Sequence, residues 1–197
     1  MIFDTSGNHC MIDLETLDTV PGGVILSIGA VMFNTDEVLH GSEFYTVIHT
    51  GSCTDVNLLV NQDTVDWWNS QPEEAQKEVL KARFASSSNP LLYALGKFSQ
   101  YLEQFDPVGI WGNGSDFDNA FLAVAYRKAG LTPPWSHKKN RCFRTLKALV
   151  GDSAVKPDTQ GTHHNALYDA RYQAIYAVSM FKALDLINQK VSSHEVR

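Results

Sequence analysis

The chain has 197 residues, of which 44% are hydrophobic and 19% charged, and its formal net charge is −6. These values are typical of one soluble globular domain, which we expect to span residues 1–197 without a membrane segment. The net negative charge argues against a protein that coats long nucleic acid through general electrostatics. The 3 cysteines are too few and too scattered for a disulfide framework or a zinc site, so we expect a cytoplasmic protein.

In chain order, the first half predicts a meander of strands followed by helices. Apolar and β-branched runs separated by short turns indicate three strands, at residues 10–16, 24–33 and 44–49. Gly29 interrupts the second of these strands. Apolar spacing and acidic first turns then indicate helices, two short ones within 61–80 and a longer one over 90–104.

The second half predicts strands that alternate with helices. Residues 108–112 form an expected strand, and a glycine turn leads into an expected helix over 116–128, with Asp116 as its N-cap. The remaining expected elements are a short strand and two helices, near 142–143, over 145–150 and over 164–186. This order of elements predicts an α/β fold with a mixed sheet.

The end of the first predicted strand carries two acids, Asp13 and Glu15. Because side chains alternate between the two faces of a strand, both carboxylates point the same way. Two neighbouring carboxylates repel each other unless a positive charge lies between them, and hard oxygen ligands suit Mg²⁺ or Mn²⁺. The alternative is that the pair marks an ordinary solvated strand end.

Two later stretches carry further acids and a histidine. Asp118 follows a predicted strand and its glycine turn, where ligands collect in α/β sheets. Asp169 follows His164 by five residues, and residues five apart on a helix diverge by about 140°. We therefore expect His164 on the loop before the last helix, where it could act as a base. The alternatives are helix-capping acids and a surface histidine.

Basic residues are concentrated in one segment, residues 127–147, which holds seven of them and no acid. This local charge suits an anionic substrate held beside an acidic metal site. A solvated helix–loop surface is the simpler explanation of such a run. Arg144 within the segment could meet phosphate or brace the site.

Together, these motifs resemble the DnaQ-like (DEDDh) 3′→5′ exonucleases. The three motifs of that family are matched in order by Asp13-x-Glu15, by Phe117-Asp118 after a strand and glycine turn, and by His164-x-x-x-x-Asp169. Finer features resemble the branch of phage DexA and exodeoxyribonuclease VIII, which also includes bacterial exoribonucleases. These features are Asp13-Leu14-Glu15-Thr16, Ile28-Gly29-Ala30-Val31, Trp67-Trp68, Trp111-Gly112-Asn113-Gly114 and Arg144-Thr145.

The resemblance implies an RNase H-like fold, with a mixed five-stranded sheet in the order 3-2-1-4-5 flanked by helices. It implies two Mg²⁺ or Mn²⁺ ions held by Asp13, Glu15, Asp118 and Asp169. His164 is then the base, because the spacing matches the histidine subclass, and His163, one residue out of register, is the weaker candidate. The four acids and His164 are the catalytic residues that we expect.

The implied activity is removal of 5′-mononucleotides from the 3′ end of single-stranded nucleic acid, with DNA favoured over RNA. Adjacent tryptophans could form a sequence-tolerant stacking platform, although core packing explains each of them equally well, and both cannot easily be buried at adjacent helical positions. The expected substrate contacts are Leu14, Thr16, Trp67, Trp68, Phe117 and Arg144. A homodimer is carried over as an analogy with related small exonucleases.

Two other functions stay open at this point. One is a DnaQ-like fold that has lost catalysis and only grips nucleic-acid ends or a partner protein. The presence of all four acids and the histidine counts against it, since lost activity usually appears first as a lost ligand. The other is a metal-dependent phosphatase that acts on small nucleotides.

Overall fold

A five-stranded mixed sheet forms the centre of the fold in the computed structural model, which describes residues 7–84, 86–158 and 164–194. The strands, in the spatial order β3-β2-β1-β4-β5, are β1 (His9–Thr16), β2 (Ile25–Phe33), β3 (Phe44–Val47), β4 (Gly109–Gly112) and β5 (Asn140–Cys142). The pairs β1–β2 and β2–β3 are antiparallel, whereas β1–β4 and β4–β5 are parallel. The predicted RNase H-like strand order, with its antiparallel meander, is confirmed.

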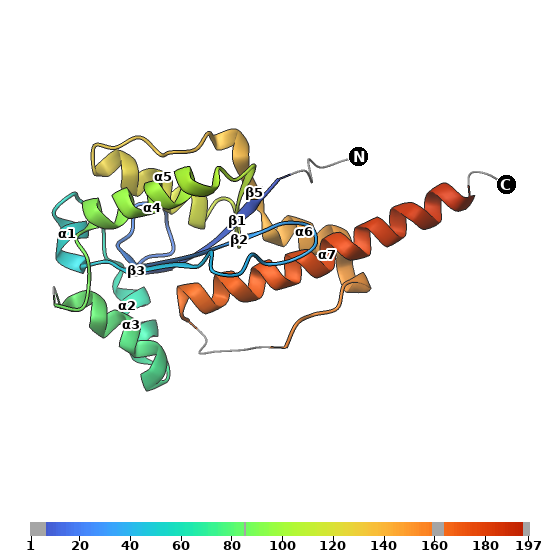
Figure 1. Cartoon of the computed structure of the whole chain (residues 1–197). Coiled ribbons are helices and arrows are strands. Elements are labelled where there is room, and N and C mark those ends of the chain that lie inside the picture. The colour runs from blue at the N-terminus through green and yellow to red at the C-terminus, as the bar shows by residue number, and fades with distance from the viewer. Residues whose placement is uncertain (1–6, 85, 159–163, 195–197) are drawn as a thin grey trace.

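Helices cover both faces of this sheet, with α4 and α5 on one face and α6 and α7 on the other (Figure 1). Helices α1, α2 and α3 connect β3 to α4 and lie at the end of the sheet where β1 ends and β2 begins (Figure 1). The helix bounds are α1 (Thr50–Thr54), α2 (Gln62–Asn69), α3 (Glu73–Arg83), α4 (Leu91–Phe105), α5 (Asp118–Lys128), α6 (Phe143–Val150) and α7 (Ala166–His194). Two 3₁₀ turns, His137–Lys139 and Gly151–Ser153, flank β5 and α6.

The alternation of β1 side chains divides the core into two layers. Ile12 and Leu14 belong to the cluster that packs on α4 and α5, whereas Met11 belongs to the cluster that packs on α7. Every residue of β2 is buried, as expected of a strand covered on both faces. Asp13 and Glu15 have odd numbers like Met11, so they point to the α7 face.

Helix α7 is the longest element, and its small residues let it approach the sheet closely. Ala170, Ala174 and Ala177 are fully buried on the side that faces β1 and β2. The helix runs on to His194, past the expected end near residue 186, and its last turns extend beyond the sheet (Figure 1). Within the described residues, no helix combines the length and apolar character that crossing a membrane would require.

The turn between β4 and α5 differs from the sequence expectation. Asp116 was expected to cap the helix, but α5 begins at Asp118, its N-cap is Phe117, and no side chain caps it. Residues 113–117 instead form a longer turn, in which Gly114 adopts a φ of 122° that glycine tolerates. The extra turn residues place Asp118 at the first position of the helix, directly beside the end of β4.

Candidate active site

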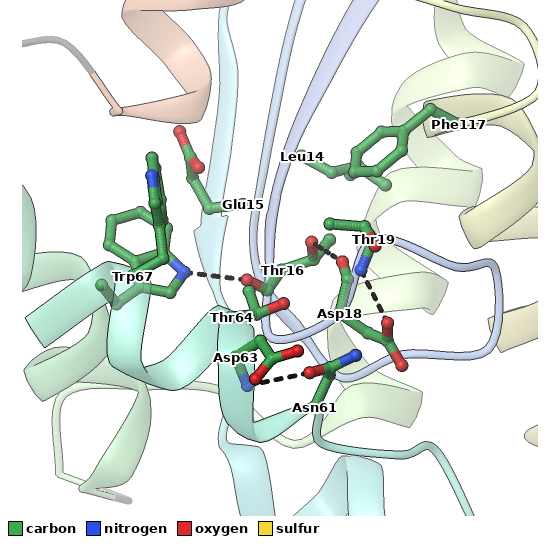
Figure 2. Close-up of a pocket in the computed structure, with 11 residues that line it drawn as sticks. Leu14, Glu15, Thr16, Asp18, Thr19, Asn61, Asp63, Thr64, Trp67 and Phe117 are labelled. Atoms are coloured by element: carbon green, nitrogen blue, oxygen red, sulfur yellow. Dashed lines mark hydrogen bonds between the residues drawn. The ribbon is translucent and has the colours of Figure 1, made fainter.

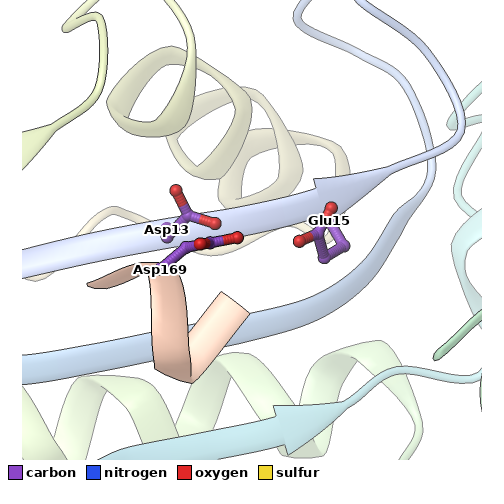
Figure 3. Close-up of side chains that lie close together, drawn as sticks. All are labelled: Asp13, Glu15 and Asp169. Carbon is purple, nitrogen blue, oxygen red and sulfur yellow. The ribbon is translucent and has the colours of Figure 1, made fainter. Parts of the chain in front are cut away.

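Three carboxylates meet at the carboxyl end of β1. Asp13, Glu15 and Asp169 each offer one oxygen, and these oxygens all lie within 4.8 Å of one another. Figure 3 shows the group, with Asp13 and Glu15 on β1 and Asp169 at the start of α7. Glu15 is buried, while Asp13 and Asp169 are half-buried. Three converging carboxylate oxygens could hold a metal ion between them.

The start of α7 is held against the sheet by a glycine and a helix cap. Gly29 pairs with Asp13 across the β1–β2 ladder, and a Cβ atom at residue 29 would collide with the backbone of Ala166 and Leu167. The side chain of Asn165 accepts a hydrogen bond of 3.2 Å from the backbone N–H of Tyr168, which caps the helix. These contacts bring the first turn of α7, and Asp169 with it, over Asp13.

Asp118 lies next to this cluster, with its carboxylate held by backbone amides. Its Oδ1 accepts a hydrogen bond of 3.2 Å from Leu14 N–H, and its Oδ2 accepts one of 2.7 Å from Asn113 N–H. Gly112 leaves room for it, because a Cβ at residue 112 would lie only 2.8 Å from Asp118 Oδ2. Each carboxylate oxygen has a second lone pair, so Asp118 can still act as a ligand.

Burial makes the anionic forms of Asp13 and Asp118 unfavourable in the absence of a cation. Burial is the main cause that raises the pKa of Asp13, and the charges of Asp118, Glu15 and Asp169 raise it further. Burial also raises the pKa of Asp118 from 3.8 to about 7, although hydrogen bonds from backbone N–H groups and the charge of Arg144 act in the opposite direction. An all-oxygen donor set with excess negative charge fits a hard divalent cation such as Mg²⁺ or Mn²⁺.

His164 lies outside helix α7, as predicted, and packs on the two tryptophans of α2. Its backbone adopts a φ of 63°, immediately before the capping residue Asn165. The imidazole centroid lies 5.0 Å from that of Trp67 and 6.0 Å from that of Trp68, with both pairs close to perpendicular. This packing joins the last helix to the region around Glu15. His163 falls outside the described residues.

A cavity of about 440 Å³ opens beside Glu15. Figure 2 shows Trp67 near Glu15 at one side of the cavity and Phe117 beside Leu14 at the other. The remaining lining residues are mostly polar, and they are Thr16, Asp18, Thr19, Asn61, Asp63, Thr64 and Trp68. Two aromatic rings around a polar floor suit a nucleotide, which has a flat base and hydrogen-bonding edges.

The adjacent tryptophans divide into one buried and one exposed ring. Trp68 is 2% exposed, and its Nε1–H donates a hydrogen bond of 2.9 Å to the backbone oxygen of Thr16. Trp67 is 44% exposed and presents its ring to the cavity. Trp68 therefore braces the end of β1, and Trp67 is the ring available for stacking.

The basic segment, residues 127–147, divides between a structural and a site-facing role. Lys139 forms an ion pair of 3.0 Å with Asp106, and Arg141 donates to the backbone oxygens of Lys138 and Asn140. Arg144 is exposed on α6, close to Gly114, and its charge counteracts the rise in the pKa of Asp118. Arg144 is thus the basic residue that the geometry links to the acids.

One residue beside the acids was absent from the sequence prediction. Gln173 is 5% exposed on α7, and its Nε2 donates a hydrogen bond of 2.7 Å to Asp13 Oδ1. The available signal was its spacing, since it follows Asp169 by four residues and so shares its helix face. The polar floor of the cavity was also missed, because Asn61, Asp63 and Thr64 read as an ordinary helix start.

The fold is that of known exonucleases. Similar solved structures include cell-death related nuclease 4 (CRN-4), with 11% identity and a TM-score of 0.64 over 90% of this chain and 64% of that one. The nuclease domain of 3′hExo, a DEDDh family member bound to rAMP, has 16% identity and a TM-score of 0.61 over 91% and 94%. E. coli exonuclease I in complex with a dT13 oligonucleotide has 14% identity and a TM-score of 0.65 over 96% and 44%. The chain thus spans less than two thirds of the CRN-4 and exonuclease I chains.

Sequence comparison identifies the family. Residues 8–181 match the family described as the 3′-5′ exoribonuclease Rv2179c-like domain. Because the match covers most of the 197 residues, the chain belongs to this family of 3′→5′ exonucleases. No curated protein matches the chain significantly. Placement in the DexA branch stays a prediction.

Proposed function

We propose that the protein is a divalent-metal-dependent exonuclease that removes 5′-mononucleotides from the 3′ end of a single strand. The observation that carries the proposal is the meeting of Asp13, Glu15 and Asp169 within 4.8 Å, beside a cavity of about 440 Å³. The acids supply the negative site that a catalytic cation needs, and the cavity supplies space for a terminal nucleotide. Assembly as a homodimer and a cytoplasmic location stay predictions.

Four acids would hold two cations, the number that the family resemblance implies. Asp13, Glu15 and Asp169 offer converging oxygens, and Asp118 offers the second lone pairs of two oxygens that are already fixed by backbone N–H groups. When bound, the ions supply positive charge that offsets the phosphodiester and favours loss of a proton from the attacking water. The rigid setting of Asp118 keeps its carboxylate aligned without a side-chain partner.

His164 would accept the proton of the attacking water. It lies on the segment before α7, packed on Trp67, whose ring lines the same cavity as Glu15. A positioned histidine suits general-base catalysis near neutral pH. Packing on two tryptophans limits the movement of the imidazole and therefore favours one orientation.

The remaining predicted residues would hold the terminal nucleotide. Leu14 and Phe117 form one wall of the cavity, and Trp67 forms the opposite wall (Figure 2). Thr16 lies between them, its backbone oxygen fixed by Trp68. Arg144 is exposed on α6 and would meet a phosphate of the strand. The cavity has room for one terminal nucleotide, which supports action at a strand end.

The nature of the sugar is the point on which the supporting observations diverge. The branch resemblance in the sequence favours DNA, and the fold is shared with an exonuclease I structure that contains dT13. The family description names exoribonucleases, and the fold is also shared with 3′hExo bound to rAMP. Because family membership covers residues 8–181, whereas the structural likenesses rest on 14–16% identity, RNA is the better-supported substrate.

Matched DNA and RNA oligonucleotides of one sequence test the proposal. With Mg²⁺, a 3′-labelled strand should release labelled mononucleotide, and a 5′-labelled strand should shorten stepwise. Asp13→Ala should abolish both, whereas Asp152→Ala, an exposed acid distant in sequence, should retain wild-type rates. Faster decay of RNA supports the family description, and faster decay of DNA supports the branch resemblance.

Two outcomes would contradict the proposed exonuclease activity. Tight binding of 3′ ends without degradation would indicate a binding module that has lost catalysis. Release of phosphate from free nucleotides, with intact oligonucleotides left uncut, would indicate a phosphatase. Either result would leave the fold and the carboxylate cluster unchanged.

A further inference from the structure

We propose that Gln173 is a positioning residue, which fixes the carboxylate of Asp13 so that its Oδ2 is presented to the divalent cation. The inference rests on the proposed function, because it concerns the same cation site. It goes further by naming a neutral residue, outside the four acids and the histidine, on which cation affinity depends.

Helix α7 directs the side chains of Gln173 and Asp169 to the same carboxylate cluster. They are four residues apart, so they lie on one helix face, one above the other. Asp169 contributes an oxygen to the cluster, and Gln173 donates a 2.7 Å hydrogen bond to Asp13 Oδ1. One helix therefore supplies both a neighbour for the cation and a support for the opposing carboxylate on β1.

A single donor on Asp13 Oδ1 has a chemical consequence for the other oxygen. Rotation about χ2 would interchange Oδ1 and Oδ2, and the hydrogen bond from Gln173 resists that rotation. Oδ2 then keeps both of its lone pairs for a ligand, whereas one of the two lone pairs of Oδ1 is engaged by the amide. The amide does this without a positive charge, whereas a lysine or arginine at residue 173 would compete directly with the cation.

Gln173 is buried, so exposure to solvent does not explain why a polar residue occupies this position. Its side chain is 5% exposed, and its Oε1 is buried without a hydrogen-bond partner. An unpaired buried acceptor costs about 1–3 kcal/mol, so an apolar residue would suit the packing better. Its helix neighbours Ala170, Ala174 and Ala177 are fully buried, so the amide lies among apolar side chains as well as beside Asp13. Asp13 is the group that receives the hydrogen bond of the buried amide.

The test measures cation binding directly, with the full chain and no nucleic acid present. Mn²⁺ affinity would be determined by titration calorimetry and by the Mn²⁺ paramagnetic resonance signal. Gln173→Leu and Gln173→Met both remove the hydrogen-bond donor and replace the amide with an apolar side chain of similar size. The matched control is Gln104→Leu, because Gln104 is exposed near the end of α4.

We expect both Gln173 variants to bind Mn²⁺ about 10–100-fold more weakly, the range typical of lost supporting hydrogen bonds around a metal site. Gln104→Leu should bind like the wild type. Melting temperatures in EDTA should change little in the Gln173 variants, because removing the unpaired amide oxygen offsets the loss of the donor to Asp13 Oδ1. High Mg²⁺ should restore the turnover that these variants lose.

Unchanged Mn²⁺ affinity in both folded Gln173 variants would overturn the inference. So would a lowered melting temperature in EDTA with affinity retained, because that pattern means a packing role. The proposed function fails separately: a wild-type protein that binds Mn²⁺ but degrades no oligonucleotide would refute the nuclease and leave the positioning role intact.

Discussion

Asp13 and Gly29 lie directly opposite each other in the β1–β2 ladder, and the first turn of α7 rests in the space that a side chain at residue 29 would occupy. The absence of a Cβ therefore determines how closely the helix approaches the sheet. That approach sets the separation between Asp169 on α7 and Asp13 on β1. A glycine that carries no functional group thus controls the geometry of the acids.

Gly29→Ala should disturb both the fold and the site. The added methyl would collide with the backbone of Ala166 and Leu167, which cannot move aside as a flexible side chain would. We expect a loss of about 1–3 kcal/mol in the free energy of unfolding, as for other overpacked cores. Mn²⁺ affinity should fall as well, because α7 must shift outward. Urea unfolding and Mn²⁺ titration measure the two effects.

Gly96→Ala provides the control for this change. Gly96 lies inside α4, and a Cβ there would meet no atom within 4 Å. Alanine should stabilise the helix by about 0.5–1 kcal/mol and leave Mn²⁺ affinity unaltered. If the two alanine variants were equally stable and bound Mn²⁺ equally, the close approach at Gly29 would not determine the site.

Stability without a cation should fall as the pH rises. Burial raises the pKa of Asp118 from 3.8 to about 7 and also raises that of Asp13. Between these two pH values, the folded protein therefore binds more protons than the unfolded chain. The stabilisation is complete below about pH 4 and is lost as the pH rises through the folded pKa, by up to about 1.4 kcal/mol per pH unit per proton. A divalent cation binds the ionised acids, so its stabilising effect should grow over the same range.

Thermal unfolding in EDTA and in Mg²⁺ between about pH 5 and about pH 8 checks this prediction. The melting temperature in EDTA should decline, and the gap between the two conditions should widen. Asp152→Asn changes an exposed acid and should preserve both trends. A melting temperature in EDTA that rises over this range would contradict the assigned pKa shifts.

Periodicity and spacing predicted the mixed α/β sheet, the facing acids of β1 and the loop position of His164, whereas the strand order came from the resemblance to the DnaQ-like exonucleases. The apolar run of β2 and the paired acids of β1 depend on local patterns, which a chain displays directly. The turn after β4 was harder to predict, because Asp116 and Asp118 are both residues that favour the start of a helix. Only the path of the turn around Gly114 shows that Phe117 occupies the cap position and that Asp118 faces β1.

Gln173 and the two tryptophans show what local patterns leave out. A glutamine within a helix usually faces solvent, and the burial of Gln173 follows from how α7 lies on the sheet. Trp67 and Trp68 are the same residue type, so their sequence does not show which one is buried. The hydrogen bond to Thr16 identifies Trp68 as the residue that supports the end of β1. Such differences arise from contacts between residues that are distant in sequence.

Substitutions of the two tryptophans should separate stability from substrate binding. Trp68→Phe removes the donor to Thr16 and should cost about 1–3 kcal/mol in the free energy of unfolding. Trp67→Ala should change stability by less than about 1 kcal/mol, because the ring is 44% exposed. Its KM for oligonucleotides should rise about tenfold, since stacking on one base is worth about 1–3 kcal/mol. A stable Trp68→Phe variant with a raised KM would reverse these roles.

His164→Ala should separate proton transfer from substrate affinity. If the imidazole accepts the proton of the attacking water, kcat should fall by about 10²–10⁴-fold, with a much smaller change in KM. Some rise in KM is expected, because the imidazole packs on Trp67, which lines the cavity. His137→Ala is the matched control, since His137 is exposed in the turn before β5. Equal kcat values for the two variants would remove His164 from the proton-transfer step, whatever happened to KM.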